Sequence, residues 1–382
     1  MGAARRNAAL LAGLVAPSQL CAVVKADGYG HGALPLARAA LAGGATWLAV
    51  ALVEEGVALR DAGIEAPILL LSEPPTAAMA DAVGHRLVPT VYTPEGVRAL
   101  GRAADRSGAP VDVHLKVDTG MHRVGADPDD AVALAAAVAD QPGLRLGALW
   151  THLAVADGAD EEDRAFTGTQ LHRFGVVAGA LADAGHRPPL THVANSAGAI
   201  AFPEARCDLV RCGIALYGYC PTPAVAGALA GATGGRRLEP VLTLRAEVAF
   251  TRRLAAGERP SYGRRRPLPG GSTVATVPIG YADGVPRRLF DVGGEVLIGG
   301  ARRPLAGVVT MDQIVVDCGP GAPPVAAGDE VVLLGRQGDQ EVSATEWADL
   351  LGTINYEILC DIGPRVPRRV VGDGPGPADG GD

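Results

Sequence analysis

The sequence predicts an α/β protein with an N-terminal (β/α)8 barrel, residues 1–235, and a smaller, mostly-β C-terminal domain, residues 236–371. Three observations support this division. Short apolar segments alternate with alanine-rich helical segments through the first half, which is the pattern of parallel βα units. A linker rich in Pro, Gly and Ala follows at 221–235. Beyond it, the sequence changes to short β-rich runs separated by frequent turns.

Eight apolar segments in the first half are predicted strands, and eight successive units favour a closed barrel over an open doubly wound sheet. The strands are expected at 20–24, 47–51, 67–71, 87–92, 111–117, 144–152, 190–194 and 208–211. Helices are expected between them, including 35–42, 53–62, 94–104, 130–139 and 161–184. The arginines and the short apolar stretch of the N-terminus indicate a first helix rather than a signal peptide.

The C-terminal domain is expected to hold strands at 241–250, 272–279, 295–298, 308–311, 313–316 and 330–334. Their shortness and the frequent turns between them are typical of a small β domain. The tail, 372–382, consists almost wholly of Gly, Pro, Asp and Ala and is expected to be disordered.

Composition excludes several classes of function. The chain has 382 residues and a formal net charge of −8, which argues against nucleic acid or an anionic membrane as the main partner. The six cysteines include no C-x-x-C pair and fit no zinc pattern, so they are expected to be reduced thiols, most of them in the core. Apolar runs are too short to span a membrane. A cytoplasmic protein without a metal site is therefore expected.

Lys25 is the most informative residue of the chain. It directly follows the predicted strand 20–24 and opens the string Lys-Ala-Asp-Gly-Tyr-Gly-His-Gly-Ala. An amine at the mouth of an apolar strand is partly desolvated, which suits Schiff-base chemistry better than a solvated surface charge. The glycines of the string allow a tight turn and a close approach to a ligand, and Tyr29 can turn its hydroxyl to the same mouth. An ordinary strand-ending lysine remains the alternative for the bare K-x-x-x-Y spacing.

Polar residues follow several other predicted strands. In a parallel barrel, functional side chains gather where strands end. Here these positions hold Lys25, the segment 116–123, His152, Asn195-Ser196 and Arg211. A single His or Arg at a strand end is usually structural, but five groups at one rim predict an active site.

The string at Lys25 closely resembles the pyridoxal 5′-phosphate (PLP) lysine motif of bacterial alanine racemases. The resemblance covers nearly the whole chain and continues, in the family's order, with Ser-Tyr-Gly at 261–263, Ile-Gly-Tyr-Ala-Asp-Gly at 279–284, Met-Asp-Gln at 311–313 and Ile-Asn-Tyr-Glu-Ile at 354–358. One departure is that the family usually begins with a short strand before its first helix, whereas this chain starts at Met1 almost inside that helix. The resemblance implies a PLP-dependent racemase that supplies D-alanine for peptidoglycan.

The resemblance also implies roles for the matching residues. Lys25 would form the Schiff base with PLP and act as base on one face of the substrate Cα. Arg211 would face the pyridine nitrogen, and because a guanidinium keeps its proton, side reactions such as transamination would stay low. Phosphate contacts are implied for Tyr29, Ser196, Tyr356 and the amides of Gly213 and Ile214.

The remaining implied roles concern the substrate and the second subunit of a homodimer. Tyr262 would reach in from the partner subunit as the opposing base, and His152 would tune that phenol, whose unperturbed pKa is about 10. Arg123 and the Met311 amide would hold the substrate carboxylate, with Lys116 carbamylated beside Arg123. Tyr281, Arg287 and Asp312 would line the corridor to the site.

Three alternatives stay open on the residues. A broader or serine-preferring racemase would share the same carboxylate clamp, and one hydroxyl changes discrimination only modestly in a pocket not built to reject it. A non-catalytic PLP-binding protein would need no opposing base such as Tyr262. A barrel-type PLP decarboxylase would present an acid, not Arg211, to the pyridine nitrogen. The last two are therefore disfavoured.

Overall fold

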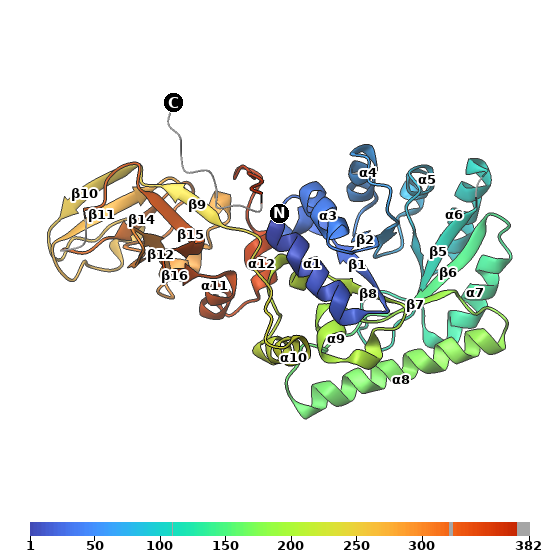
Figure 1. Ribbon diagram of the computed structural model, residues 1–382. Helices are drawn as coiled ribbons and strands as arrows, with labels where there is room; N and C mark the ends of the chain where they lie inside the picture. Colours follow the sequence, from blue (N-terminus) through green and yellow to red (C-terminus); the bar gives the residue numbers. More distant parts are fainter. Residues whose placement is uncertain (109, 321–323, 373–382) are drawn as a thin grey trace. The chain divides into compact units, whose positions relative to one another are not determined.

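The computed structural model describes residues 1–108, 110–320 and 324–372 (Figure 1). The chain divides into two compact units. The first comprises Met1–Gly28, Gly32–Glu239 and the segment from Val370, and the second comprises Tyr29–His31 and Pro240–Arg369. Apart from Gly372, the tail expected to be disordered lies outside the described residues.

A closed parallel barrel forms the first unit, and its fold confirms the predicted class. Its strands pair in the orders β3-β2-β1-β8 and β4-β5-β6-β7. Backbone hydrogen bonds join the two halves, from Leu70 N to Val88 O and from Arg211 N to Ala194 O, both at 2.9 Å. The strands are β1 (Gln19–Val23), β2 (Trp47–Val50), β3 (Ile68–Leu70), β4 (Thr90–Val91), β5 (Val111–Lys116), β6 (Leu144–Trp150), β7 (Leu190–His192) and β8 (Leu209–Cys212).

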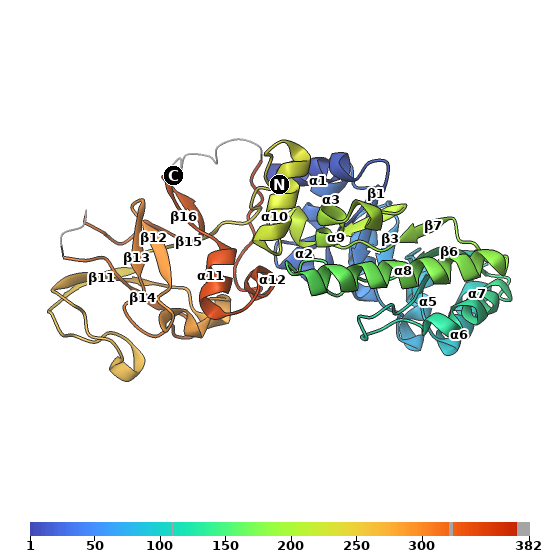
Figure 2. The ribbon, with the colours of Figure 1, turned by 90° about the horizontal axis from the view of Figure 1, so that it is seen from below.

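Helices surround these strands (Figures 1 and 2). Alanine and leucine supply most of their buried faces, for example in α3 and α7, because few aromatic side chains are present. The helices of this unit are α1 (Gly2–Val15), α3 (Ala33–Ala42), α4 (Val53–Asp61), α5 (Met79–Gly84), α6 (Pro94–Ser107), α7 (Ala131–Ala139), α8 (Glu161–Asp183), α9 (Ser196–Ala201) and α10 (Pro223–Thr233).

Helix α10 corrects the prediction that residues 221–235 form a linker. Thr222 caps the helix by accepting a hydrogen bond from Val225 N, Pro223 occupies the first turn, and Gly234 ends it in the left-handed conformation. Alanine and leucine between these caps favour a helix despite the two internal glycines. The two units divide after Glu239, which pairs with Arg6 on α1 at 2.7 Å.

The second unit is mostly β, as predicted. It contains a three-stranded antiparallel sheet, β10-β11-β14, and a second sheet in which β15 pairs with β12, β16 and β9. Its elements are β9 (Leu244–Glu247), β10 (Phe250–Leu254), β11 (Ser272–Val277), β12 (Glu295–Ile298), β13 (Ala301–Pro304), β14 (Ile314–Asp317), β15 (Glu330–Gln337), β16 (Gln340–Val342), α11 (Ala344–Leu351) and α12 (Asn355–Cys360).

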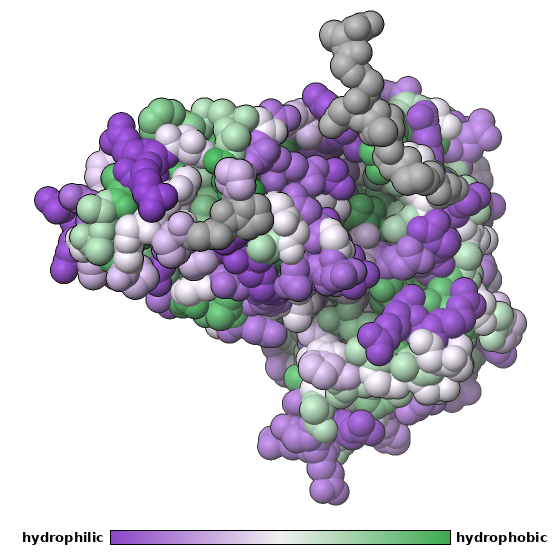
Figure 3. Space-filling view, turned by 60° about the vertical axis from the view of Figure 1, so that its left-hand side comes forward, coloured by the Kyte–Doolittle hydropathy of each residue, from purple (hydrophilic) through white to green (hydrophobic). Residues whose placement is uncertain are grey.

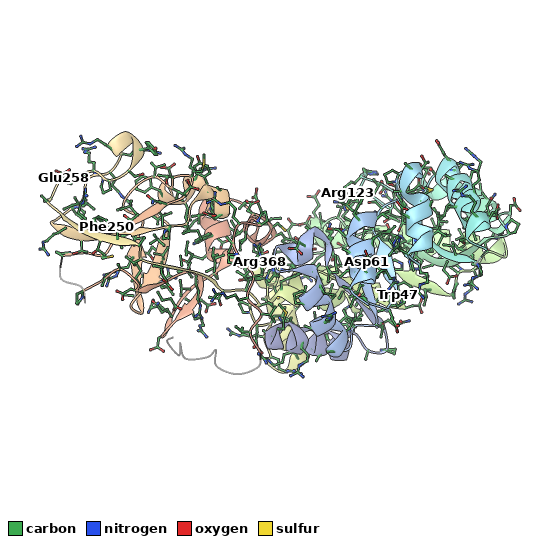
Figure 4. The ribbon with its side chains drawn as sticks, turned by 90° about the horizontal axis from the view of Figure 1, so that it is seen from above. Trp47, Asp61, Arg123, Phe250, Glu258 and Arg368 are labelled. Atoms are coloured by element: carbon green, nitrogen blue, oxygen red, sulfur yellow. The ribbon has the colours of Figure 1, made fainter. Side chains whose placement is uncertain are left out.

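Of the strands predicted in this unit, one is wrong and one is only partly right. The segment 308–311 is a turn, because Thr310 hydrogen-bonds Gln313 O through both its backbone N, at 3.0 Å, and its hydroxyl, at 2.8 Å. The predicted strand 241–250 is instead divided between β9 and the start of β10. These two strands join different sheets, and β10 carries the exposed Phe250 labelled in Figure 4.

The surface is mixed in polarity, and the cysteines differ in burial. On the face seen in Figure 3, hydrophilic side chains are widespread, with hydrophobic ones between them. Within the described part of the chain, no helix combines the length and apolarity needed to cross a bilayer. The prediction that the cysteines lie in the core is right for Cys21, Cys212 and Cys318, which are buried. It is wrong for Cys207 and Cys360, which are exposed.

Candidate active site

Lys25 begins a left-handed turn, α2 (Lys25–Tyr29), immediately after β1. The φ angles of Ala26, Asp27 and Tyr29 are 53°, 49° and 50°, a conformation that costs a non-glycine residue about 1–2 kcal/mol. Hydrogen bonds close the turn, from Gly28 N to Val24 O at 2.9 Å and from Ala33 N to the Asp27 carboxylate at 2.8 Å. Strain of this kind persists only where the surroundings enforce it, and it is common at functional sites.

Arg211, on β8, is a buried cation with neutral partners. Only 3% of it is exposed. Its guanidinium donates to Thr151 O at 2.8 Å, to Val193 O at 3.0 Å, and to the imidazoles of His192 and His152. Among the described residues no carboxylate pairs with it. Burial lowers the pKa of Arg211 to about 10, so it stays charged at neutral pH. A buried cation without a carboxylate partner is unusual and marks a candidate functional site.

The histidines around Arg211 have defined proton positions. Because a guanidinium only donates, the Nδ1 atoms of His192 and His152, at 2.8 and 3.1 Å, must accept. His192 then carries its proton on Nε2 and donates to His114 Nδ1 at 3.0 Å. Burial first and Arg211 second lower the pKa of all three imidazoles, that of His114 to about 3. His152 is therefore neutral, with its proton on Nε2.

Lys116, at the end of β5, has an unusual environment. It is 4% exposed, and its Nζ lies 4.4 Å from the centre of the Trp150 ring, which Arg211 also contacts, at 4.5 Å. Burial, then Arg211 and Arg123, lower the pKa of Lys116 to about 7. Asp118, the alternative ion-pair partner, instead accepts hydrogen bonds from three backbone amides and contacts His122 at 3.3 Å. The lowered pKa favours the neutral, nucleophilic form of the Lys116 amine more than in an ordinary lysine.

The predicted phosphate contacts of the barrel lie together. Ser196 Oγ, after β7, accepts hydrogen bonds from Gly213 N at 2.9 Å and Ala215 N at 3.4 Å, after β8. Ile214 lies between these two amides in the sequence. Arg123, labelled in Figure 4, is exposed in the segment that follows β5.

Tyr29 and Tyr356 lie in the second unit, with ring centroids 5.9 Å apart. The turn that holds Tyr29 is fixed within this unit by Arg368 (Figure 4), whose Nε donates to Gly30 O at 2.9 Å. The remaining guanidinium nitrogens of Arg368 donate to backbone carbonyls of residues 362–366. Arg368 therefore holds the residue after Tyr29 together with the segment that follows α12, the helix of Tyr356.

The other predicted residues of the second unit are solvent-exposed in the single chain. Tyr281 N donates to Thr310 O at 3.0 Å, and so lies beside the Met311 segment. Asp312 pairs with Arg365 at 2.9 Å. Tyr262 is 74% exposed and Met311 is 52% exposed, and Arg287 is exposed at the start of a 3-10 turn.

Several supporting residues were not predicted. Gln170, on α8, donates to Thr119 Oγ1 at 3.1 Å and to His152 O at 3.0 Å, and thereby joins the ends of β5 and β6. Glu55, on α4, accepts a hydrogen bond from Ala26 N at 2.6 Å. The sequence places Glu55 in the first turn of a predicted helix, which indicates a capping role. That position gives no sign of the contact beside Lys25.

Comparisons with known proteins match this chain over almost its full length. Residues 1–221 match the alanine racemase N-terminal domain, and residues 241–370 match the C-terminal domain. The chain belongs to the alanine racemase family. Members of this family are PLP-dependent isomerases.

Individual alanine racemases are similar to this chain over nearly its full length. The alanine racemase of Symbiobacterium thermophilum is 44% identical over 98% of this chain and 96% of its own length. That of Thermobifida fusca is 42% identical over 96% of this chain and 95% of its own. The alanine racemase structure from Streptomyces coelicolor superimposes with a TM-score of 0.87 at 40% identity, covering 96% of this chain and 95% of that one.

Proposed function

We propose that the chain acts in the cytoplasm as a homodimer with shared active sites, with Lys25 and Tyr262 as opposed bases and PLP as cofactor. As an alanine racemase, it interconverts L-alanine and D-alanine, and D-alanine is a precursor of peptidoglycan. The residue assignments rest above all on the buried guanidinium of Arg211, whose hydrogen-bond partners among the described residues are all neutral. A PLP decarboxylase of this fold class would instead need an acid there.

The barrel residues fit PLP. Lys25 would hold it covalently, and Arg211, which has no carboxylate partner among the described residues, would donate to its ring nitrogen. Ser196 and the amides of Gly213 and Ile214 would bind its phosphate, with Tyr29 and Tyr356. When bound, PLP withdraws electrons from the substrate Cα and acidifies its proton.

Two bases solve a geometric problem of racemisation. One group cannot easily remove a proton from one face of a planar carbon and return it to the other face. The Lys25 amine would serve one face, and the Tyr262 phenol of the second subunit would serve the other. His152 keeps its proton on Nε2, because its Nδ1 accepts from Arg211. It can therefore donate to the Tyr262 oxygen and stabilise the phenolate.

The substrate carboxylate would be held by Arg123 and the Met311 amide. Tyr281, Arg287 and Asp312 would line the corridor from solvent. Incubation of the purified protein and PLP with L-alanine or L-serine, followed by chiral chromatography, tests the function directly. Formation of D-alanine supports it, and D-serine as the faster product would favour the serine-racemase alternative.

Lys116 is expected to be carbamylated. Its neutral amine would attack CO2 and release one proton, and the resulting anion would attract Arg123 instead of repelling it. Because only the neutral amine reacts, occupancy should rise from about pH 6 to about pH 8, through the pKa near 7. Carbon-13 NMR of protein in labelled bicarbonate should show one carbamate signal that Lys116→Gln removes. A spectrum without that signal at about pH 8 would contradict the carbamate.

Arg211→Glu should increase transamination relative to racemisation. A carboxylate at this position would let the ring nitrogen keep a proton, so the ring would withdraw electrons more strongly. We expect slower racemisation, by about 10²-fold, and more pyruvate per D-alanine formed. Arg145→Glu, at an exposed ion pair on β6, is the control. An unchanged pyruvate ratio in a variant shown by circular dichroism to be folded would reject this role.

A further inference from the structure

Glu55 connects the two loops that follow β1 and β2. One carboxylate oxygen accepts from Ala26 N at 2.6 Å, directly after Lys25. The other accepts from Ala51 N at 2.8 Å and Leu52 N at 3.1 Å, at the start of α4. One side chain thus caps a helix and holds the lysine turn at the same time.

The lysine turn needs such a partner. The first amides of any helical turn lack acceptors within the turn, and Ala26 N is one of them. Ala26 is also the first residue forced into the left-handed region, with φ 53° and ψ 51°. A charged acceptor forms a stronger hydrogen bond than a neutral one and can hold this peptide against its local preference. The peptide concerned joins Lys25 to Ala26, so its orientation sets where the Lys25 side chain leaves the backbone.

We propose that Glu55 is a positioning residue for Lys25, which holds the left-handed turn so that the amine meets the cofactor and the substrate. The inference rests on the proposed function of Lys25. It assigns to Glu55 an effect on the reactive lysine that is separate from its cap on α4.

The chain provides a matched control for that cap. Glu73, after β3, makes the same kind of contacts in another loop. Its carboxylate accepts from Tyr92 N at 2.7 Å, Thr93 N at 2.9 Å and Thr93 Oγ1 at 2.6 Å, at the start of α6. These contacts lie in the same barrel and do not involve the turn at Lys25. Glu73→Gln therefore reports the loss of a carboxylate cap alone.

The sequence also makes Lys25 easy to observe. The chain contains only two lysines, Lys25 and Lys116. Protein labelled with carbon-13 at the lysine ε-carbon should give two NMR signals, and Lys25→Ala identifies one of them. The state of the lysine can therefore be measured in the holoenzyme independently of turnover.

Glu55→Gln keeps one acceptor oxygen and replaces the other with a donor, so it cannot serve both loops. We expect it to shift or broaden the Lys25 signal, leave the Lys116 signal in place, weaken PLP binding, and lower kcat about 10- to 100-fold. KM for alanine should change little, because Arg123 and Met311 are not involved. Both variants should lower the melting temperature by a similar amount, because each loses a carboxylate cap. Glu73→Gln should leave the Lys25 signal, PLP binding and kcat at their wild-type values.

Glu55→Asp is the second variant if Glu55→Gln does not fold. It keeps the charge near α4 but is too short to reach Ala26 as well, so the same changes at Lys25 are expected. The inference is overturned if a folded Glu55 variant matches Glu73→Gln in the Lys25 signal, PLP affinity and kcat. Failure of the proposed function would differ: wild-type protein would not racemise alanine, or borohydride would attach PLP to a residue other than Lys25.

Discussion

Lys25→Ala should abolish racemisation in both directions, by about 10³-fold or more, together with the covalent attachment of PLP. The reason is that the only other lysine of the chain, Lys116, is buried beside the Trp150 ring. Wild-type holoenzyme should be yellow, and borohydride should fix PLP to the peptide that contains Lys25. The variant should lose the colour and the adduct, and chiral chromatography should detect no product.

Lys116→Gln is the matched variant for that experiment, because it removes the other lysine. It should keep the borohydride adduct on Lys25. An adduct on Lys116 in the Lys25→Ala protein would instead place the cofactor lysine on β5.

Mixing Lys25→Ala subunits with Tyr262→Phe subunits should restore activity that neither variant has alone. If each site takes Lys25 from one subunit and Tyr262 from the other, a mixed dimer has one site without either base and one intact site. Random exchange makes about half of the dimers mixed, so roughly a quarter of wild-type activity should return. The measurement is the racemisation rate after exchange, with mixed dimers confirmed by mass spectrometry.

A second mixture controls for restored folding or stability. Lys25 and Arg211 lie in the same barrel, so mixing Lys25→Ala with Arg211→Glu should leave every site damaged. No recovery is expected there. If the Lys25→Ala and Tyr262→Phe mixture also failed to recover, both bases would belong to one subunit.

Much of the fold could be predicted because its signals are local. Each barrel strand is a short apolar segment followed by a helical one, and eight such units favour a closed barrel. The errors occurred where local signals conflict. Residues 221–235 contain enough Pro and Gly to suggest a linker, yet Thr222 and Gly234 cap a helix made mainly of alanine and leucine. Residues 308–311 are apolar enough for a strand, but the Thr310 and Gln313 hydrogen bonds close a turn.

By itself, the sequence determined the family, the barrel, and the residues expected at its rim, because motifs such as the string at Lys25 are contiguous in the chain. Only the tertiary structure decided the chemical state of those residues. Among the described residues, the lack of an acid beside Arg211, the lowered pKa of Lys116 and the proton position on His152 all depend on neighbours from other strands. Glu55 reaches Ala26 across 29 residues of sequence. Desolvation and hydrogen bonding act through space, so no spacing along the chain can reveal them.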